Sequence, residues 1–299
     1  MADPSSSGIL SRRPNPSIVD AFWKYVAERH AIWQRRQEGL AAPWTTDPIL
    51  AEFHFCNVFR ELDQGCLWYK NYVASVLPYQ FPEVLWRTIV FRLVNNWRMF
   101  NKNFGGIPDR SEWRDMIVLL RKRGVVLNSP AHLTLPRPLH LHNRLDRFEH
   151  ILDLINREFQ VLVSTIQHAD SLQKVSLALQ SEYGIGPFIA LQIYRDLIMV
   201  GQLPFNDDDW VEFGPGAERG IQRMVPTLKR VSEMRNFVLM LRESQWGAWK
   251  RLHLTPVKLE NHDISLCDIE HNLCEFSRYC TIGESSGGRR RRYRPSASF

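Results

Sequence analysis

Long apolar runs are missing from this sequence. No stretch approaches the roughly twenty apolar residues that a membrane-spanning helix needs, and the N-terminal segment MADPSSSGILSRRPNP lacks the apolar core of a signal peptide. We therefore expect no membrane contact. The five cysteines are an odd number in a chain of 299 residues without a secretory signal, which favours reduced thiols over a disulfide framework.

Strand patterns are scarce and no internal repeat is visible. Apolar residues instead recur at helical spacing, in segments 17–40, 48–77, 81–100, 111–122, 143–167, 171–183, 187–200 and 217–244. Ser17 is expected to cap the first of these helices, and Asp47 with Pro48 the second. The sequence predicts an all-α fold with a disordered N-terminus (1–16), one helical domain (17–280) and a disordered tail (281–299).

Positive charge is concentrated at the C-terminus. The formal net charge is +6, but residues 281–299 contain five arginines and one glutamate, so the rest of the chain is nearly neutral. The tail GGRRRRYRPSASF is typical of a nuclear localisation signal or of a flexible nucleic-acid arm. A solvated tail without a role is the alternative. We expect a nuclear protein that binds DNA.

A helical hairpin surrounds Gly184-Ile185-Gly186, with Pro187 at the start of the next helix. Exposed N–H groups at a helix start can hold a backbone phosphate. The stretch resembles the helix-hairpin-helix motif of DNA glycosylases, although Glu182, Tyr183 and Ile189 depart from that motif. This resemblance implies DNA-backbone contacts at Gly184, Gly186 and Phe188. Phe188 stands where bifunctional glycosylases carry a Schiff-base lysine, so a lyase reaction is not expected.

The glycosylase resemblance also points to the cluster PFNDDDW. Asp207 follows the hairpin at the distance expected of the family's catalytic aspartate, with Asp209 and Trp210 beside it. A helix cap or a solvated loop would explain the same acidic triplet.

Five further stretches together resemble one narrower family. They are FHFCNVFRELDQG (53–65), FRLVNNW (91–97), GIGPFIALQIYRDL (184–197), FGPGAERGI (213–221) and DIEHNLCEFSRY (268–279). The chain is similar over about residues 45–280 to the helical domain of 5-hydroxymethyluracil (5-hmdU) DNA kinases and of alpha-glutamyl/putrescinyl-thymine pyrophosphorylases, which are related to helix-hairpin-helix glycosylases.

The resemblance implies work on hypermodified thymine in DNA. The chemistry would be substitution at the base methylene or cleavage of the glycosidic bond, and a base-oxidising dioxygenase or a DNA kinase would be a partner in the pathway. The chain contains no GxxxxGK[ST] phosphate-binding motif, so it is not expected to be a P-loop kinase. A non-catalytic reader of modified bases is the alternative, and no cofactor is expected.

Chemistry on a base requires a pocket for the extruded nucleotide, with aromatic walls and a carboxylate. The predicted catalytic residues are Asp207, Asp209 and Glu270, and the predicted substrate-binding residues are Arg60, Asp63, Asn95, Trp210, Gly214 and Gly216. An ordinary surface ion pair could equally explain Arg60 with Asp63, and a cap or solvated face could explain Glu270. Cys267, His271, Cys274 and Cys280 have unusual spacing for zinc, and no metal site is predicted.

Overall fold

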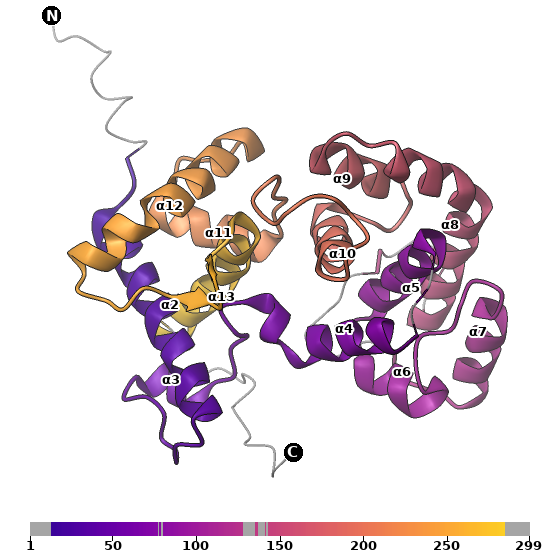
Figure 1. Ribbon diagram of the computed structural model, residues 1–299, viewed down its shortest axis with the longest axis horizontal. Helices are drawn as coiled ribbons and strands as arrows, with labels where there is room; N and C mark the ends of the chain where they lie inside the picture. The colour runs from indigo at the N-terminus through magenta and orange to yellow at the C-terminus, as the bar shows by residue number, and fades with distance from the viewer. Residues whose placement is uncertain are drawn as a thin grey trace, which may run out of the picture. The chain divides into compact units, whose positions relative to one another are not determined.

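Residues 13–76, 78, 80–127, 135–136, 141 and 143–284 are described by the computed structural model of the protein. They form twelve α-helices, one 3-10 turn and one short antiparallel pair of strands, which Figure 1 shows. The predicted all-α fold is confirmed. No helix in this part of the chain is both long and apolar enough to cross a membrane. The predicted terminal segments lie outside the described residues, except for 13–16 and 281–284.

The chain divides into two compact units. Unit 1 comprises Met1–Asp63 and Phe213–Phe299, and unit 2 comprises Gln64–Glu212. Both ends of the sequence therefore build the first unit, while the middle builds the second. The predicted single domain over residues 17–280 stays a prediction.

Unit 1 is organised around its last helix. Its elements are α2 (Pro16–Gln37), α3 (Pro48–Glu52), the 3-10 turn η1 (Arg60–Leu62), α11 (Pro215–Met224), α12 (Val231–Arg251), β1 (Lys258–Leu259), β2 (His262–Asp263) and α13 (Leu266–Glu284). Helix α13 packs against α2, α3, α11 and α12. Because it is covered on several sides, polar as well as apolar side chains of α13 are buried.

Unit 2 is organised around a buried helix. Its elements are α4 (Gln64–Val76), α5 (Phe81–Val94), α6 (Trp97–Phe104), α7 (Trp113–Lys122), α8 (Arg144–Gln167), α9 (Leu172–Gln180) and α10 (Pro187–Met199). Every residue of α5 from Val84 to Val94 is buried. Helices α8 and α10 both pack against α5, which explains why most of its side chains are apolar.

Several predicted helices are shorter than expected. The side chain of Asn15, rather than Ser17, caps α2 by accepting from the Ser17 N–H. Asp47 caps α3 as predicted, with its carboxylate accepting from two backbone N–H groups. The helix predicted over 48–77 is wrong in its middle, because α3 ends at Glu52 and α4 begins only at Gln64.

Two other predicted helices are interrupted. The 81–100 helix breaks at Asn95, which has a left-handed conformation with φ of 49°. The 217–244 helix breaks between α11 and α12, where Pro226 cannot supply a helical N–H.

Candidate functional site

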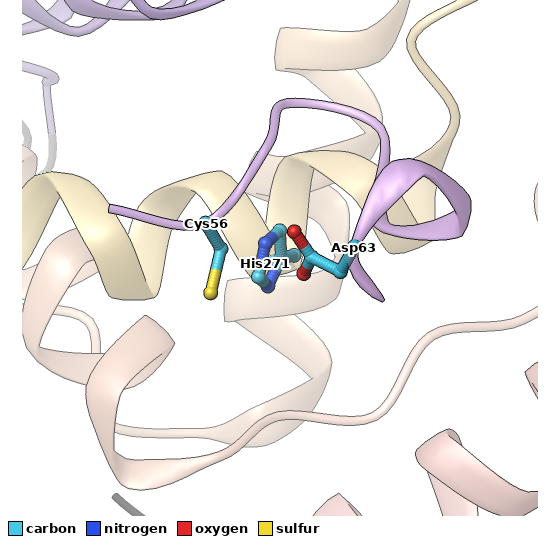
Figure 2. Close-up of side chains that lie close together, drawn as sticks. All are labelled: Cys56, Asp63 and His271. Atoms are coloured by element: carbon cyan, nitrogen blue, oxygen red, sulfur yellow. The ribbon is translucent and has the colours of Figure 1, made fainter. Parts of the chain in front are cut away.

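A cluster of ionisable side chains in unit 1 joins the segment after α3 to α13. Cys56 and Asp63 lie on the segment, and His271 lies on α13. The sulfur, a carboxylate oxygen and an imidazole nitrogen lie within 4.8 Å of one another. Figure 2 shows the imidazole ring between the other two side chains in this view. His271 is buried, while Cys56 and Asp63 are half-buried.

Helix α2 fixes the segment that carries Cys56 and Asp63. The buried Arg29 guanidinium donates from Nη2 to the Phe55 carbonyl at 3.1 Å and to Asn57 Oδ1 at 2.8 Å. The Asn57 backbone N–H in turn donates to Asp63 Oδ1 at 2.9 Å, and its side chain donates to the Leu62 carbonyl at 2.8 Å. These bonds use the polar groups of a non-helical segment and explain why it does not continue α3.

Helix α13 fixes the same segment from the other side. Glu275 Oε2 accepts from the Cys56 backbone N–H at 3.0 Å. Asn272 Nδ2 donates to the Val58 carbonyl at 2.9 Å. The Arg278 guanidinium donates to Glu275 Oε1 at 3.2 Å, which orients that carboxylate. The backbone around Cys56 is therefore held by side chains from two helices.

Burial changes the proton affinity of the cluster. It raises the pKa of Asp63, against the opposing effects of a backbone N–H and of Arg60. It raises the pKa of Glu275, against the opposing charge of Arg278. Burial and the neighbouring carboxylates also raise the pKa of the Cys56 thiol well above its usual value. These groups keep their protons at higher pH than in water.

Arg60 and Asp63 are close, but not for the predicted reason. The helix predicted over 48–77 would place them on one face of an α-helix; instead Arg60 begins the turn η1, and the Asp63 N–H closes that turn on the Arg60 carbonyl at 2.9 Å. The Arg60 charge still lowers the pKa of Asp63. Its Nε is buried without a hydrogen-bond partner among the described residues. A guanidinium with an unused donor suits an anionic ligand.

Glu270, Gly214 and Gly216 lie where α11 meets α13. Glu270 Oε1 accepts from the Gly214 N–H at 3.0 Å, at the residue that caps α11. A carboxylate there is stabilised by the unsatisfied N–H groups of the helix start. A Cβ on Gly216 would lie 2.1 Å from Cys274 Sγ, so this glycine permits close helix packing. All three residues thus have structural roles, and their predicted functional roles stay predictions.

The predicted aspartates of unit 2 are hydrogen-bonded within their own loop and to α10. Asp207 Oδ2 accepts from Arg195 Nε at 2.9 Å and from Nη2 at 2.5 Å. Asp209 accepts from the backbone and side chain of Asn206 at 2.8 and 2.9 Å. Asp209 therefore closes a local turn, whereas Asp207 is held by a cation from a helix.

Trp210 is anchored by a buried carboxylate. Its indole N–H donates to Glu212 Oε1 at 2.8 Å, and the same oxygen accepts from Ser176 Oγ at 2.9 Å. Tyr194 donates to the Trp210 carbonyl at 3.3 Å. The residue as a whole is half-buried.

Asn95 belongs to a buried polar network. Arg92 donates from Nη1 to Asn95 Oδ1 at 3.0 Å and from Nε to Asp196 Oδ2 at 2.5 Å, and Nη2 contacts both Asp196 Oδ1 and Cys66 Sγ. The side chains of Arg92 and Asp196 are 2% and 3% exposed. This network joins two of the segments that carry the family resemblance, FRLVNNW and GIGPFIALQIYRDL.

The predicted hairpin joins α9 to α10. Gly184 has φ of +91°, and a Cβ there would lie 2.8 Å from the Ile151 side chain. Gly186 caps α10, is exposed and has no steric need to be glycine. The exposed N-terminus next to Phe188 leaves room for an anion. The assignment as a DNA-binding helix-hairpin-helix stays a prediction.

The predicted residues are divided between the two units. Arg60, Asp63 and Glu270 belong to unit 1 with Gly214 and Gly216, while unit 2 holds Asp207, Asp209, Trp210, Asn95 and the hairpin.

Sequence reasoning missed Cys56 and Asp196 altogether. Both residues lie inside the stretches that carry the family resemblance. The presence of Cys56 and Asp196 in those stretches could have marked them as candidates. Neither residue, however, has a local spacing that indicates its distant partner, which is His271 for Cys56 and Arg92 for Asp196.

Comparison with known proteins agrees with the family resemblance. The family model for the 5-hmdU DNA kinase helical domain matches residues 16–287. The chain is 25% identical over 301 residues to a 5-hmdU DNA kinase of Bacillus phage SP10, covering 92% of this chain and 47% of that protein. It thus spans about half the length of the curated relative it matches, and no solved structure matches it significantly. The chain belongs to the family of 5-hmdU DNA kinase helical domains.

Proposed function

We propose that this protein acts on 5-hydroxymethyluracil, or a derivative of it, in DNA. The main support is the family match over residues 16–287. The phage relative is named for 5-hmdU DNA kinase activity, and the family segments FHFCNVFRELDQG and DIEHNLCEFSRY build the ionisable cluster of unit 1. The side chains of this cluster are held from two helices and suit the binding of a ligand.

The proposed chemistry is substitution at the base methylene or cleavage of the glycosidic bond. This chain contains no phosphate-cradling GxxxxGK[ST] motif, so we assign it chemistry at the base. In a substitution, the bond from the methylene carbon to a phosphate or diphosphate oxygen breaks while a bond to an amine nitrogen forms. The amine gives up a proton to a carboxylate base as the anion departs.

Asp207, one of the two aspartates predicted from sequence for this role with Asp209, is the proposed general base. Its Oδ2 is occupied by Arg195, which fixes the carboxylate in place. The neighbouring Asp208 is exposed, so Asp208→Asn is a matched control that removes the same charge one residue away.

The test measures binding and turnover separately. DNA duplexes carrying thymine, uracil, 5-hydroxymethyluracil or its phosphorylated forms are incubated with the protein and amine donors, and nucleosides are analysed by mass spectrometry. Fluorescence anisotropy gives the affinity for each duplex. An enzyme converts one of the modified bases, and Asp207→Asn abolishes this while Asp208→Asn does not. Equal affinity for all duplexes together with no conversion would refute the proposal.

A non-catalytic reader is the second candidate, supported by Trp210 beside the acidic cluster, because aromatic side chains stack on bases. A reader binds the modified duplex more tightly than the thymine duplex, converts none of them, and keeps its preference in Asp207→Asn. We also propose, from the arginine-rich tail, that the protein is nuclear, and that a base-oxidising dioxygenase or a DNA kinase produces its substrate. Loss of nuclear fluorescence on deleting the tail of a tagged protein would support the localisation.

A further inference from the structure

Cys56, Asp63 and His271 bring together three different metal-binding groups. Their ligand atoms lie within 4.8 Å of one another. In the described part of the chain, these three residues form a group of histidine, cysteine and acidic side chains close enough together to hold a metal ion. Two residues come from the segment after α3 and the third comes from α13, far away in the sequence. The tertiary structure alone creates this arrangement.

We propose that Cys56, Asp63 and His271 bind a zinc ion with one coordination position open. A thiolate, an imidazole and a carboxylate are the groups that Zn²⁺ binds in proteins, whereas Mg²⁺ and Ca²⁺ prefer oxygen alone. Structural zinc sites have four protein ligands, and catalytic sites have three with a water or substrate oxygen in the fourth position. Three protein ligands, two of them half-buried, fit the second kind.

Hydrogen bonds from the surroundings orient Asp63 and the backbone of Cys56. The Asn57 N–H donates to Asp63 Oδ1, which orients that carboxylate, and Glu275 binds the backbone of Cys56 rather than its thiol. Polar neighbours that orient metal ligands in this way strengthen metal binding. When zinc binds, the S–H bond of Cys56 breaks and its proton passes to solvent as the S–Zn bond forms.

Charged groups of both signs surround the site. Glu275 accepts from Arg278, and the Asp63 carboxylate lies near the charges of Arg60 and Arg29. The zinc pattern weighed from sequence, with Cys267, Cys274 and Cys280 around His271, does not form a ligand group among the described residues.

Cobalt(II) provides a direct test, because thiolate ligation gives it a charge-transfer absorption and tetrahedral geometry gives intense visible bands. The full chain is freed of metal with a chelator and titrated with Co²⁺ and then Zn²⁺. We expect one Co²⁺ per chain with both signals, displaced by Zn²⁺. Cys56→Ser loses the charge-transfer band, whereas Cys280→Ser, a half-buried cysteine on the same helix as His271, keeps it.

Two further measurements do not depend on that variant folding. Asp63→Asn, which is nearly isosteric, keeps the thiolate band but binds Co²⁺ at least about tenfold more weakly. In the unmodified chain, Zn²⁺ protects Cys56 from alkylation by iodoacetamide, as mapped by mass spectrometry, and leaves Cys280 alkylated at the same rate.

Three outcomes overturn the zinc site. They are the absence of Co²⁺ binding, a charge-transfer band that survives Cys56→Ser, and a rate of Cys56 alkylation that Zn²⁺ does not change. Fast alkylation independent of zinc would indicate a nucleophilic thiol with His271 as its base instead. None of these readouts involves DNA, so their failure leaves the proposed action on 5-hydroxymethyluracil to its own test.

Discussion

Removing the carboxylate of Asp196 should destabilise unit 2 strongly. Arg92 and Asp196 are joined by hydrogen bonds from Nε and Nη2, and their side chains are 2% and 3% exposed. The pair lies between α5 and α10, two helices that pack against each other in the core of the unit. Asp196→Ala would leave the guanidinium charge buried, with Asn95 and Cys66 as remaining acceptors.

The expected cost is about 3–5 kcal/mol, the range for breaking a buried ion pair by deleting one partner. At a urea dependence of about 2 kcal/mol per molar, the unfolding midpoint of unit 2 falls by about 1.5–2.5 M. Replacing both partners with apolar residues, as in Arg92→Met with Asp196→Leu, removes the uncompensated charge. The double variant should therefore be more stable than Asp196→Ala.

The assay is urea unfolding combined with hydrogen exchange. Because tryptophans lie in both units, fluorescence alone does not separate them, and exchange is read by mass spectrometry in peptides from α5 and α10. Asp153→Ala is the control. Asp153 pairs with Arg157 at 2.5 Å, but these side chains are 28% and 66% exposed, so the control should cost at most about 1 kcal/mol.

The reasoning is wrong if Asp196→Ala costs no more than Asp153→Ala. It is also wrong if the apolar double variant is less stable than Asp196→Ala. The first result would mean that water reaches Arg92 in the variant, and the second that the pair is more favourable than apolar packing.

Three other perturbations test different parts of the structure. Gly220→Ala places a Cβ 2.3 Å from the Leu273 carbonyl oxygen of α13 and should lower the free energy of unfolding of unit 1 by about 3 kcal/mol, as measured by thermal unfolding. Gly247→Ala is its control, because a Cβ there meets open space in α12, and it should be neutral or stabilising in the same assay. Burial, and then the charge of Arg29, lower the pKa of His30 to about 4. The unfolded chain therefore binds this proton at higher pH than the folded chain does, and stability falls as pH drops from about 6.5 to about 4. His30→Gln should flatten that part of the curve of stability against pH, and an unchanged slope would contradict the lowered pKa of His30. Deleting residues 285–299 should weaken DNA binding at low salt. The slope of the logarithm of the DNA association constant against log salt should become shallower by about 0.9 for each phosphate that the tail neutralises in the full chain. The preference among modified bases, measured by competition, should stay the same.

Local patterns in the sequence determined the class of the fold and many helix starts. The all-α class followed from apolar spacing, and Asp47 caps α3 as its side-chain chemistry requires. Pro187 opens α10, as expected of a residue with no N–H to contribute to the helix. The family membership could also be predicted, because the five stretches that carry it are contiguous. Such features depend on residues within one or two helical turns, which a sequence displays directly.

Only the tertiary structure decided where helices stop and which polar residues meet. The segment 53–59 reads as helix, but Arg29, Asn272 and Glu275 bind its backbone and side chains in a non-helical conformation. Arg92 pairs with Asp196, 104 residues away in the sequence. His271, near the other end of the chain, lies beside Cys56 and Asp63. Local preferences amount to tenths of a kcal/mol per residue, whereas leaving a buried charge or polar group without a partner costs several times more. Pairing over long distances therefore overrides helix propensity at these positions, and no local spacing in the sequence reveals it.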